Sequence, residues 1–210
     1  MMAIDDLLVK YPDLQPIAGD IQKAVSVLHD SFRKGGKLLV CGNGGSAADS
    51  DHIVGELMKG FMKPRRIPAD EARQLEQVYG EEGRQLAEQL QGALPAISLG
   101  SHVALISAIA NDTDDRVAYA QQVYGYGRAD DVLLGISTSG NSRNVLAAVQ
   151  VAKIKRLKTI GLTGASGGRL LDLCDVTIRV PYVRTPDVQE RHLPIYHAIC
   201  IALEEAFFAS

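Results

Sequence analysis

The chain has 210 residues and a formal net charge of −3, which fits one globular domain and argues against a broad basic face for nucleic acid. Hydrophobic residues make up 46% of it and charged residues 22%, and no apolar run approaches the length of a membrane span. Its three cysteines form no CxxC pair, and its first residues lack the pattern of a signal peptide, so we expect a soluble, cytoplasmic protein.

The first long helix is predicted over residues 15–34, where apolar residues recur at helical spacing. Residues 38–41, Leu-Leu-Val-Cys, have the pattern of a buried strand, and Gly-Asn-Gly-Gly-Ser follows at residues 42–46. The glycines allow a sharp turn, and Ser46 is the expected N-cap of the next helix. A strand, a glycine turn and a helix start together expose backbone N–H groups, so we expect a site for an anion, most often a phosphate.

The helix that follows the glycine turn carries a histidine and a carboxylate on one face. His52 and Glu56 are four residues apart, which places them one above the other. Beside a phosphate site, this pair suggests catalysis, although a surface ion pair and a purely structural glycine turn are the simpler alternatives. A dinucleotide-binding turn is disfavoured, because residues 62–66, Met-Lys-Pro-Arg-Arg, stand where that fold needs an acidic residue.

The rest of the chain alternates between strands and helices. A charged segment at about residues 66–93, interrupted at Gly80 and Gly83, is predicted to be a kinked helix or a short helical hairpin, either largely solvated or docked on a partner subunit. Strands are expected at residues 94–99, 131–136, 158–162 and 175–180, and helices at residues 101–110 (with Ser101 as N-cap), 115–124, 144–153 and 186–208. This order predicts an α/β fold with a doubly wound, five-stranded parallel sheet flanked by helices, flavodoxin-like or Rossmann-like. We expect a single domain over residues 1–210, with N-terminal helices at 1–34 and the segment 66–93 as an insert.

A second anion-binding loop is expected after the strand at residues 131–136. The sequence Ser-Thr-Ser-Gly-Asn-Ser at residues 137–142 offers four hydroxyl groups and a glycine, and its last serine can cap the next helix. Hydroxyls and N–H groups without a lysine suit a phosphate monoester, whereas the Walker pattern of nucleotide hydrolysis is absent. An ordinary serine-rich loop is the alternative.

Taken together, these motifs resemble the sugar isomerase (SIS) domain family. The resemblance rests on CGNGGS with His52 and Glu56, on ISTSGNS, on LTG at residues 162–164, and on Gln189-Glu190-x-His192 followed by His197. Within the family, the chain looks most like the phosphoheptose isomerases. This implies an aldose–ketose isomerase that converts sedoheptulose 7-phosphate to D-glycero-D-manno-heptose 7-phosphate through an enediolate, in heptose precursor biosynthesis.

The resemblance also implies residue roles. Glu56 would be the catalytic base and His197 the acid. Substrate contacts would come from Asn43, Gly44, Gly45, Ser46, Glu56, Asn111, Asp112, Ser137, Thr138, Ser139, Ser142 and Gln189. Some members bind zinc, through residues that correspond here to His52, Glu56, Gln189 and His197, and no nucleotide cofactor is implied. A homotetramer with shared active sites is also implied.

Two departures and two alternative functions accompany this interpretation. Pro194 lies between Gln189 and His197 and is expected to bend the helix that carries both, and the insert has no counterpart in the parent pattern. One SIS branch is a non-catalytic adaptor that binds the bacterial replication initiator; there the helix glutamate and terminal histidine are replaced, whereas this chain has both. A sugar-phosphate sensor would need the phosphate loops but no acid–base pair.

Overall fold

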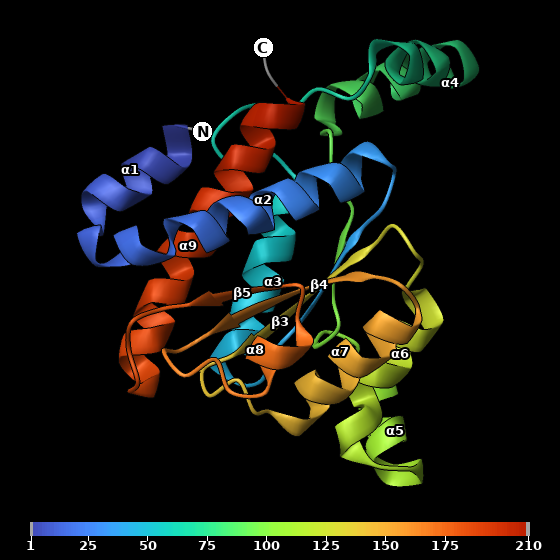
Figure 1. Ribbon diagram of the computed structural model, residues 1–210. Coiled ribbons are helices and arrows are strands. Elements are labelled where there is room, and N and C mark those ends of the chain that lie inside the picture. Colours follow the sequence, from blue (N-terminus) through green and yellow to red (C-terminus); the bar gives the residue numbers. More distant parts are fainter. Residues whose placement is uncertain (1, 209–210) are drawn as a thin grey trace.

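The core of the protein is a five-stranded parallel sheet in the order β2-β1-β3-β4-β5 (Figure 1). The computed structural model describes residues 2–208, so residues 1, 209 and 210 of the predicted domain lie outside it. The strands are β1 Leu38–Cys41, β2 Ala96–Ser98, β3 Val132–Ser137, β4 Lys158–Thr163 and β5 Val176–Arg179. The predicted α/β fold is therefore confirmed, with each predicted strand in place and its ends within two residues of the predicted ones.

Helices cover both faces of this sheet, because side chains alternate along each strand. In β1, Leu38 and Val40 join a core cluster with α1, α2, α3 and α9, whereas Leu39 and Cys41 join the opposite cluster with α6, α7 and α8. The helical segments are α1 Met2–Lys10, η1 Pro12–Ile17, α2 Ala18–Arg33, α3 Gly45–Met58, α4 Ala69–Gln89, α5 Val103–Asp112, η2 Asp115–Val117, α6 Ala118–Tyr126, α7 Arg143–Ile154, α8 Leu170–Leu173 and α9 Thr185–Phe207. None of those over residues 2–208 is long and apolar enough to cross a bilayer.

The strand order places a topological switch point between β1 and β3. The chain leaves β1 for α3 on one face of the sheet and leaves β3 for α7 on the other face. In open α/β sheets, ligands bind beyond the carboxyl ends of strands at such a switch point. The glycine turn and the hydroxyl-rich loop both lie there.

The α4 segment is a helical hairpin that extends away from the sheet (Figure 1). Gly80 reverses the chain with φ 60° and ψ −132°, a conformation that a side chain would strain. At Gly83 an added Cβ would lie 2.0 Å from the Leu75 carbonyl oxygen, so glycine lets the two arms pack closely. Of the two predicted alternatives, a kinked helix and a helical hairpin, the structure has the hairpin. Most residues of α4 are exposed.

Of the three serines predicted to cap helices, two do not occupy the N-cap, and the third occupies it without the expected hydrogen bond. Gly44 occupies the N-cap of α3, and Ser46 lies buried inside the first turn. His102, not Ser101, precedes α5, because the Ser101 hydroxyl pairs with the Asp51 carboxylate. Ser142 does occupy the N-cap of α7, but its hydroxyl bonds to Ser137 instead of to the helix backbone.

Candidate active site

The glycine turn after β1 packs tightly against the start of α3 and against α9. Gly44 has φ 57°, which favours glycine. An added Cβ on Gly42 would lie 2.6 Å from the Ser46 carbonyl oxygen, and one on Gly45 would lie 2.6 Å from Gln189 Nε2. Gln189, on α9, is therefore brought directly to the glycine turn.

The two loops at the switch point are joined by a pair of asparagines. Asn43 and Asn144 exchange amide hydrogen bonds of 2.9 and 2.8 Å. The Tyr119 hydroxyl donates to the Gly42 carbonyl at 2.5 Å and lies 3.4 Å from Asn43 Oδ1. Sequence reasoning missed Tyr119 and Asn144; only the place of Asn144, two residues after Ser142, could have drawn attention to it. Asn43 is thus held in place from two sides.

The hydroxyl-rich loop has a fixed shape. Ser137 and Ser142 are linked hydroxyl to hydroxyl at 2.9 Å, and the Ser139 hydroxyl accepts from the Asn141 N–H at 3.2 Å. Gly140 has φ 67° and lies where an added Cβ would be 1.9 Å from a backbone oxygen of the loop after β4. Thr138 is partly exposed. A hollow of about 610 Å³ opens beside this loop and is lined by Asn43, Asp114, Asp115, Arg116, Ser142, Arg143 and Asn144.

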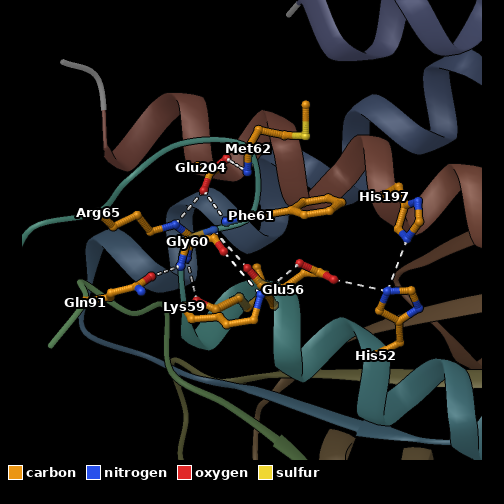
Figure 2. A network of polar contacts seen from close by, with 11 residues as sticks. His52, Glu56, Lys59, Gly60, Phe61, Met62, Arg65, Gln91, His197 and Glu204 are labelled. Atoms are coloured by element: carbon orange, nitrogen blue, oxygen red, sulfur yellow. Dashed lines mark hydrogen bonds and ion pairs between the residues drawn. The ribbon is translucent and has the colours of Figure 1, made fainter. Parts of the chain in front are cut away.

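A second cluster, formed by His52, Glu56 and His197, joins α3 to α9 (Figure 2). His52 Nε2 lies 3.1 Å from Glu56 Oε1 and 3.4 Å from His197 Nε2. The Glu56 side chain is only 13% exposed, and its Oε2 is buried with no hydrogen-bond partner among the described residues. The Lys59 ammonium lies 3.8 Å from that oxygen. The two residues predicted to be base and acid therefore meet at one histidine.

Burial shapes the charges in this cluster. It lowers the pKa of His197, with nearby His52 acting in the same direction and Glu56 opposing, so His197 is neutral near pH 7. Burial also raises the pKa of Asp49, against a hydrogen bond from Tyr196. His52 thus bridges the neutral imidazole of His197 and the carboxylate of Glu56, an arrangement suited to moving protons.

Comparisons with known proteins agree with this geometry. A family model described as SIS domain matches residues 14–92 and 75–164. The phosphoheptose isomerase of Pelobacter propionicus is 39% identical over 197 residues, covering 94% of this chain and 89% of the relative. The one from Rhodospirillum rubrum is 37% identical over 201 residues, covering 96% and 92%. The chain belongs to the phosphoheptose isomerase branch of the SIS domain family.

Solved structures of phosphoheptose isomerases share the fold. The structure from Francisella tularensis aligns with a TM-score of 0.77 at 32% identity and covers 93% of this chain and 91% of that one. The structure from Neisseria gonorrhoeae aligns with a TM-score of 0.70 at 34% identity, covering 88% and 86%. The sequence-based assignment to this family is confirmed.

Two residues with an implied phosphoheptose isomerase role lie elsewhere than the clusters above. Asn111 and Asp112 are the last two residues of α5, are exposed, and bond to each other at 2.8 Å. They are not among the described residues that line the hollow. Asp114 and Asp115, shortly after the end of α5, line it instead. Their predicted contact with substrate stays a prediction.

The four residues predicted to bind zinc are partly assembled. His52, Glu56 and His197 are in contact, whereas Gln189 lies against Gly45, seven residues before His52 on α3 and so roughly 10 Å away along the helix. Pro194 does not interrupt α9, which runs from Thr185 to Phe207. Within residues 2–208, no three His, Cys, Asp or Glu side chains form a ready metal-binding group. The donor types nevertheless suit zinc.

His192 makes stability depend on pH in this member of the family. Its ring is fully buried on α9, neither nitrogen has a partner among the described residues, and burial lowers its pKa from 6.5 to about 4. Between these values the unfolded chain binds a proton that the native protein does not, so the free energy of unfolding falls as pH drops from 6.5 towards 4, by about 3 kcal/mol in all. Urea unfolding at pH 7.5 and pH 5 measures the part of this loss that occurs above pH 5. His192→Leu should show a smaller loss than wild type, and the surface variant His29→Gln an equal one; equal losses in all three would contradict the prediction.

Proposed function

We propose that the protein interconverts sedoheptulose 7-phosphate and D-glycero-D-manno-heptose 7-phosphate through an enediolate. The observation that carries this proposal is the meeting of Glu56 and His197 at His52 Nε2, at 3.1 and 3.4 Å. A phosphate-binding protein without catalysis would not need a carboxylate and an imidazole joined through a second histidine. The relatives named phosphoheptose isomerase, which align with nearly the whole chain, support the choice of substrate.

In this proposal Glu56 moves the proton between carbons. The carboxylate takes the proton from C1 of the ketose and returns it to C2. This second transfer yields the aldose. Glu56 Oε2 has no hydrogen-bond donor among the described residues, so no neighbouring donor engages its lone pairs. His197 transfers the accompanying proton between the oxygens on C1 and C2, so that the enediolate carries no lasting charge.

The two loops at the switch point would hold the rest of the sugar phosphate. The hydroxyls of the loop after β3 and the N-terminal end of α7 suit the phosphate, with the exposed Arg143 beside them. Asn43, fixed by Asn144, would meet the sugar hydroxyls. The full proposed set of contacts is Asn43, Gly44, Gly45, Ser46, Glu56, Asn111, Asp112, Ser137, Thr138, Ser139, Ser142 and Gln189.

We also infer a zinc ion held by His52, Glu56, Gln189 and His197. Ligand atoms about 2.0–2.1 Å from a tetrahedral zinc lie about 3.3 Å from one another. The contacts of His52 Nε2 with Glu56 and His197, at 3.1 and 3.4 Å, are close to that spacing. When bound, zinc would polarise the carbonyl and stabilise the enediolate oxygens. Gln189 is the weakest member of the set, since its amide lies against Gly45.

An isomerisation assay tests the function and the metal together. Purified protein should convert sedoheptulose 7-phosphate to the aldose, lose that activity after treatment with a zinc chelator, and regain it when Zn²⁺ is restored. Activity that persists in the presence of the chelator would contradict the proposal that the enzyme needs zinc. Binding of the sugar phosphate without turnover would favour a sensor, and binding of the replication initiator alone would favour the adaptor. A tetramer with shared sites belongs to the same proposal, and sedimentation of the purified protein tests it.

A further inference from the structure

Tyr196 makes contacts within the candidate active site that the proposed reaction does not use. It precedes His197 on α9, is 2% exposed, and directs its hydroxyl towards α3. The hydroxyl oxygen lies 3.0 Å from His52 Nδ1 and 3.2 Å from Asp49 Oδ1. Its ring packs edge-on against His52 and against His197, with centroids 5.5 and 5.1 Å apart. Tyr196 therefore touches His52 on the side opposite Glu56.

The direction of these hydrogen bonds follows from the number of protons. A tyrosine hydroxyl has one proton to donate, and an ionised carboxylate accepts only. A charged acceptor forms the stronger bond, so the hydroxyl donates to Asp49. The same oxygen has then no proton left to give, so its 3.0 Å contact with His52 Nδ1 is a hydrogen bond when that nitrogen carries the proton. A phenol has an ordinary pKa of about 10, so the hydroxyl keeps its proton at neutral pH.

We propose that Tyr196 is a positioning residue that holds a proton on Nδ1 of His52 through the chain His52 to Tyr196 to Asp49. The other nitrogen, Nε2, then presents its lone pair to Glu56 at 3.1 Å and to His197 at 3.4 Å. A lone pair and a carboxylate oxygen at that distance need a cation or a proton between them. Imidazole binds metal ions through such a lone pair, with the second nitrogen fixed by a hydrogen bond. The inference rests on the proposed function and explains how His52 is prepared for it.

The location of the proton can be measured directly. Nitrogen-15 NMR of the metal-free protein shows which ring nitrogen of His52 is protonated. The signals of His52 are those that disappear in the variant His52→Asn. We expect Nδ1 to be protonated in the wild type and Nε2 in Tyr196→Phe, which keeps the ring but removes the acceptor. Asp49→Ala is a second test, because Tyr196 would then donate to Nδ1 and displace its proton. Tyr182→Phe is the matched control, since that hydroxyl bonds to Asp13 at 2.9 Å, away from His52.

Metal affinity gives a second measurement. Titration with Zn²⁺ against a coloured chelator should show binding about 10- to 100-fold weaker in Tyr196→Phe than in wild type, as for other groups that orient a ligand. Tyr182→Phe should bind like wild type. The proposal is overturned if Nδ1 of His52 is unprotonated in the wild type, or if Tyr196→Phe leaves it protonated, whether or not Zn²⁺ binds. The chelator assay above decides the metal separately.

Discussion

Replacing Glu56 with Gln is expected to lower kcat by about 100- to 10,000-fold while sedoheptulose 7-phosphate still binds. The amide has nearly the shape of the carboxylate but cannot accept the carbon-bound proton at neutral pH. Phosphate binding should persist, because the loops after β1 and β3 do not depend on this side chain for their hydrogen bonds. The loss should therefore appear in kcat and leave the dissociation constant of the substrate nearly unchanged.

Exchange of the carbon-bound proton with solvent deuterium separates this role from a general loss of activity. Wild-type protein should exchange the C1 proton of the ketose, and Glu56→Gln should not, even where substrate binding measured by calorimetry is intact. Glu71→Gln, an exposed carboxylate on α4, is the matched control and should behave like wild type. Turnover in Glu56→Gln comparable to that of wild type would refute the assignment of the base.

The parts of this site that depend on short stretches of sequence could be predicted. Buried parallel strands are short apolar runs, so β1 and β3 and the loops that follow them were recognisable. His52 and Glu56 share a helix face because of their spacing alone, and the structure has them 3.1 Å apart.

The parts that depend on contacts between distant segments could not be predicted in this way. Asn43 and Asn144 are 101 residues apart, and Tyr196 and His52 are 144 apart, so no local pattern joins them. The predicted capping bond of α7 is absent for a related reason. Ser142 occupies the N-cap, but its hydroxyl bonds to the Ser137 hydroxyl instead of to the helix backbone. The family motifs located the site, and tertiary packing decided which side chains hold it together.

Replacing Arg65 with Met is expected to destabilise the protein by about 3–5 kcal/mol, because it leaves a buried carboxylate without its partner. Arg65 and Glu204 both have side chains that are 0% exposed, with Nε 2.7 Å from Oε1 (Figure 2). The guanidinium also donates to the carbonyl oxygens of Leu57 and Glu56 at the end of α3, at 2.7 and 2.9 Å. These carbonyls have no later helical turn to pair with, so Arg65 closes the end of the helix.

The Arg65–Glu204 network matters for the candidate active site because it joins α3, which carries Glu56, to α9, which carries His197. Glu204 accepts two further hydrogen bonds, from the N–H groups of Phe61 and Met62 at 2.9 and 2.8 Å. Burial alone would raise the pKa of Glu204, but these bonds and Arg65 outweigh it and hold the pKa below 4.5. The stabilisation is therefore complete above pH 4.5 and is lost as the pH falls below that value.

Thermal unfolding at fixed protein concentration measures the effect. For a chain of this size, a loss of 3–5 kcal/mol corresponds to a melting temperature lower by roughly 6–20 °C in Arg65→Met. The exposed neighbour gives the control, Arg66→Met, which should melt near the wild-type temperature. The double variant Arg65→Met, Glu204→Met should recover part of the loss, because no buried charge is then left unpaired. Equal melting temperatures for wild type and Arg65→Met would show that the ion pair does not hold α3 to α9. In that case the contact between His52 on α3 and His197 on α9 would have to depend on the packing of the helices alone.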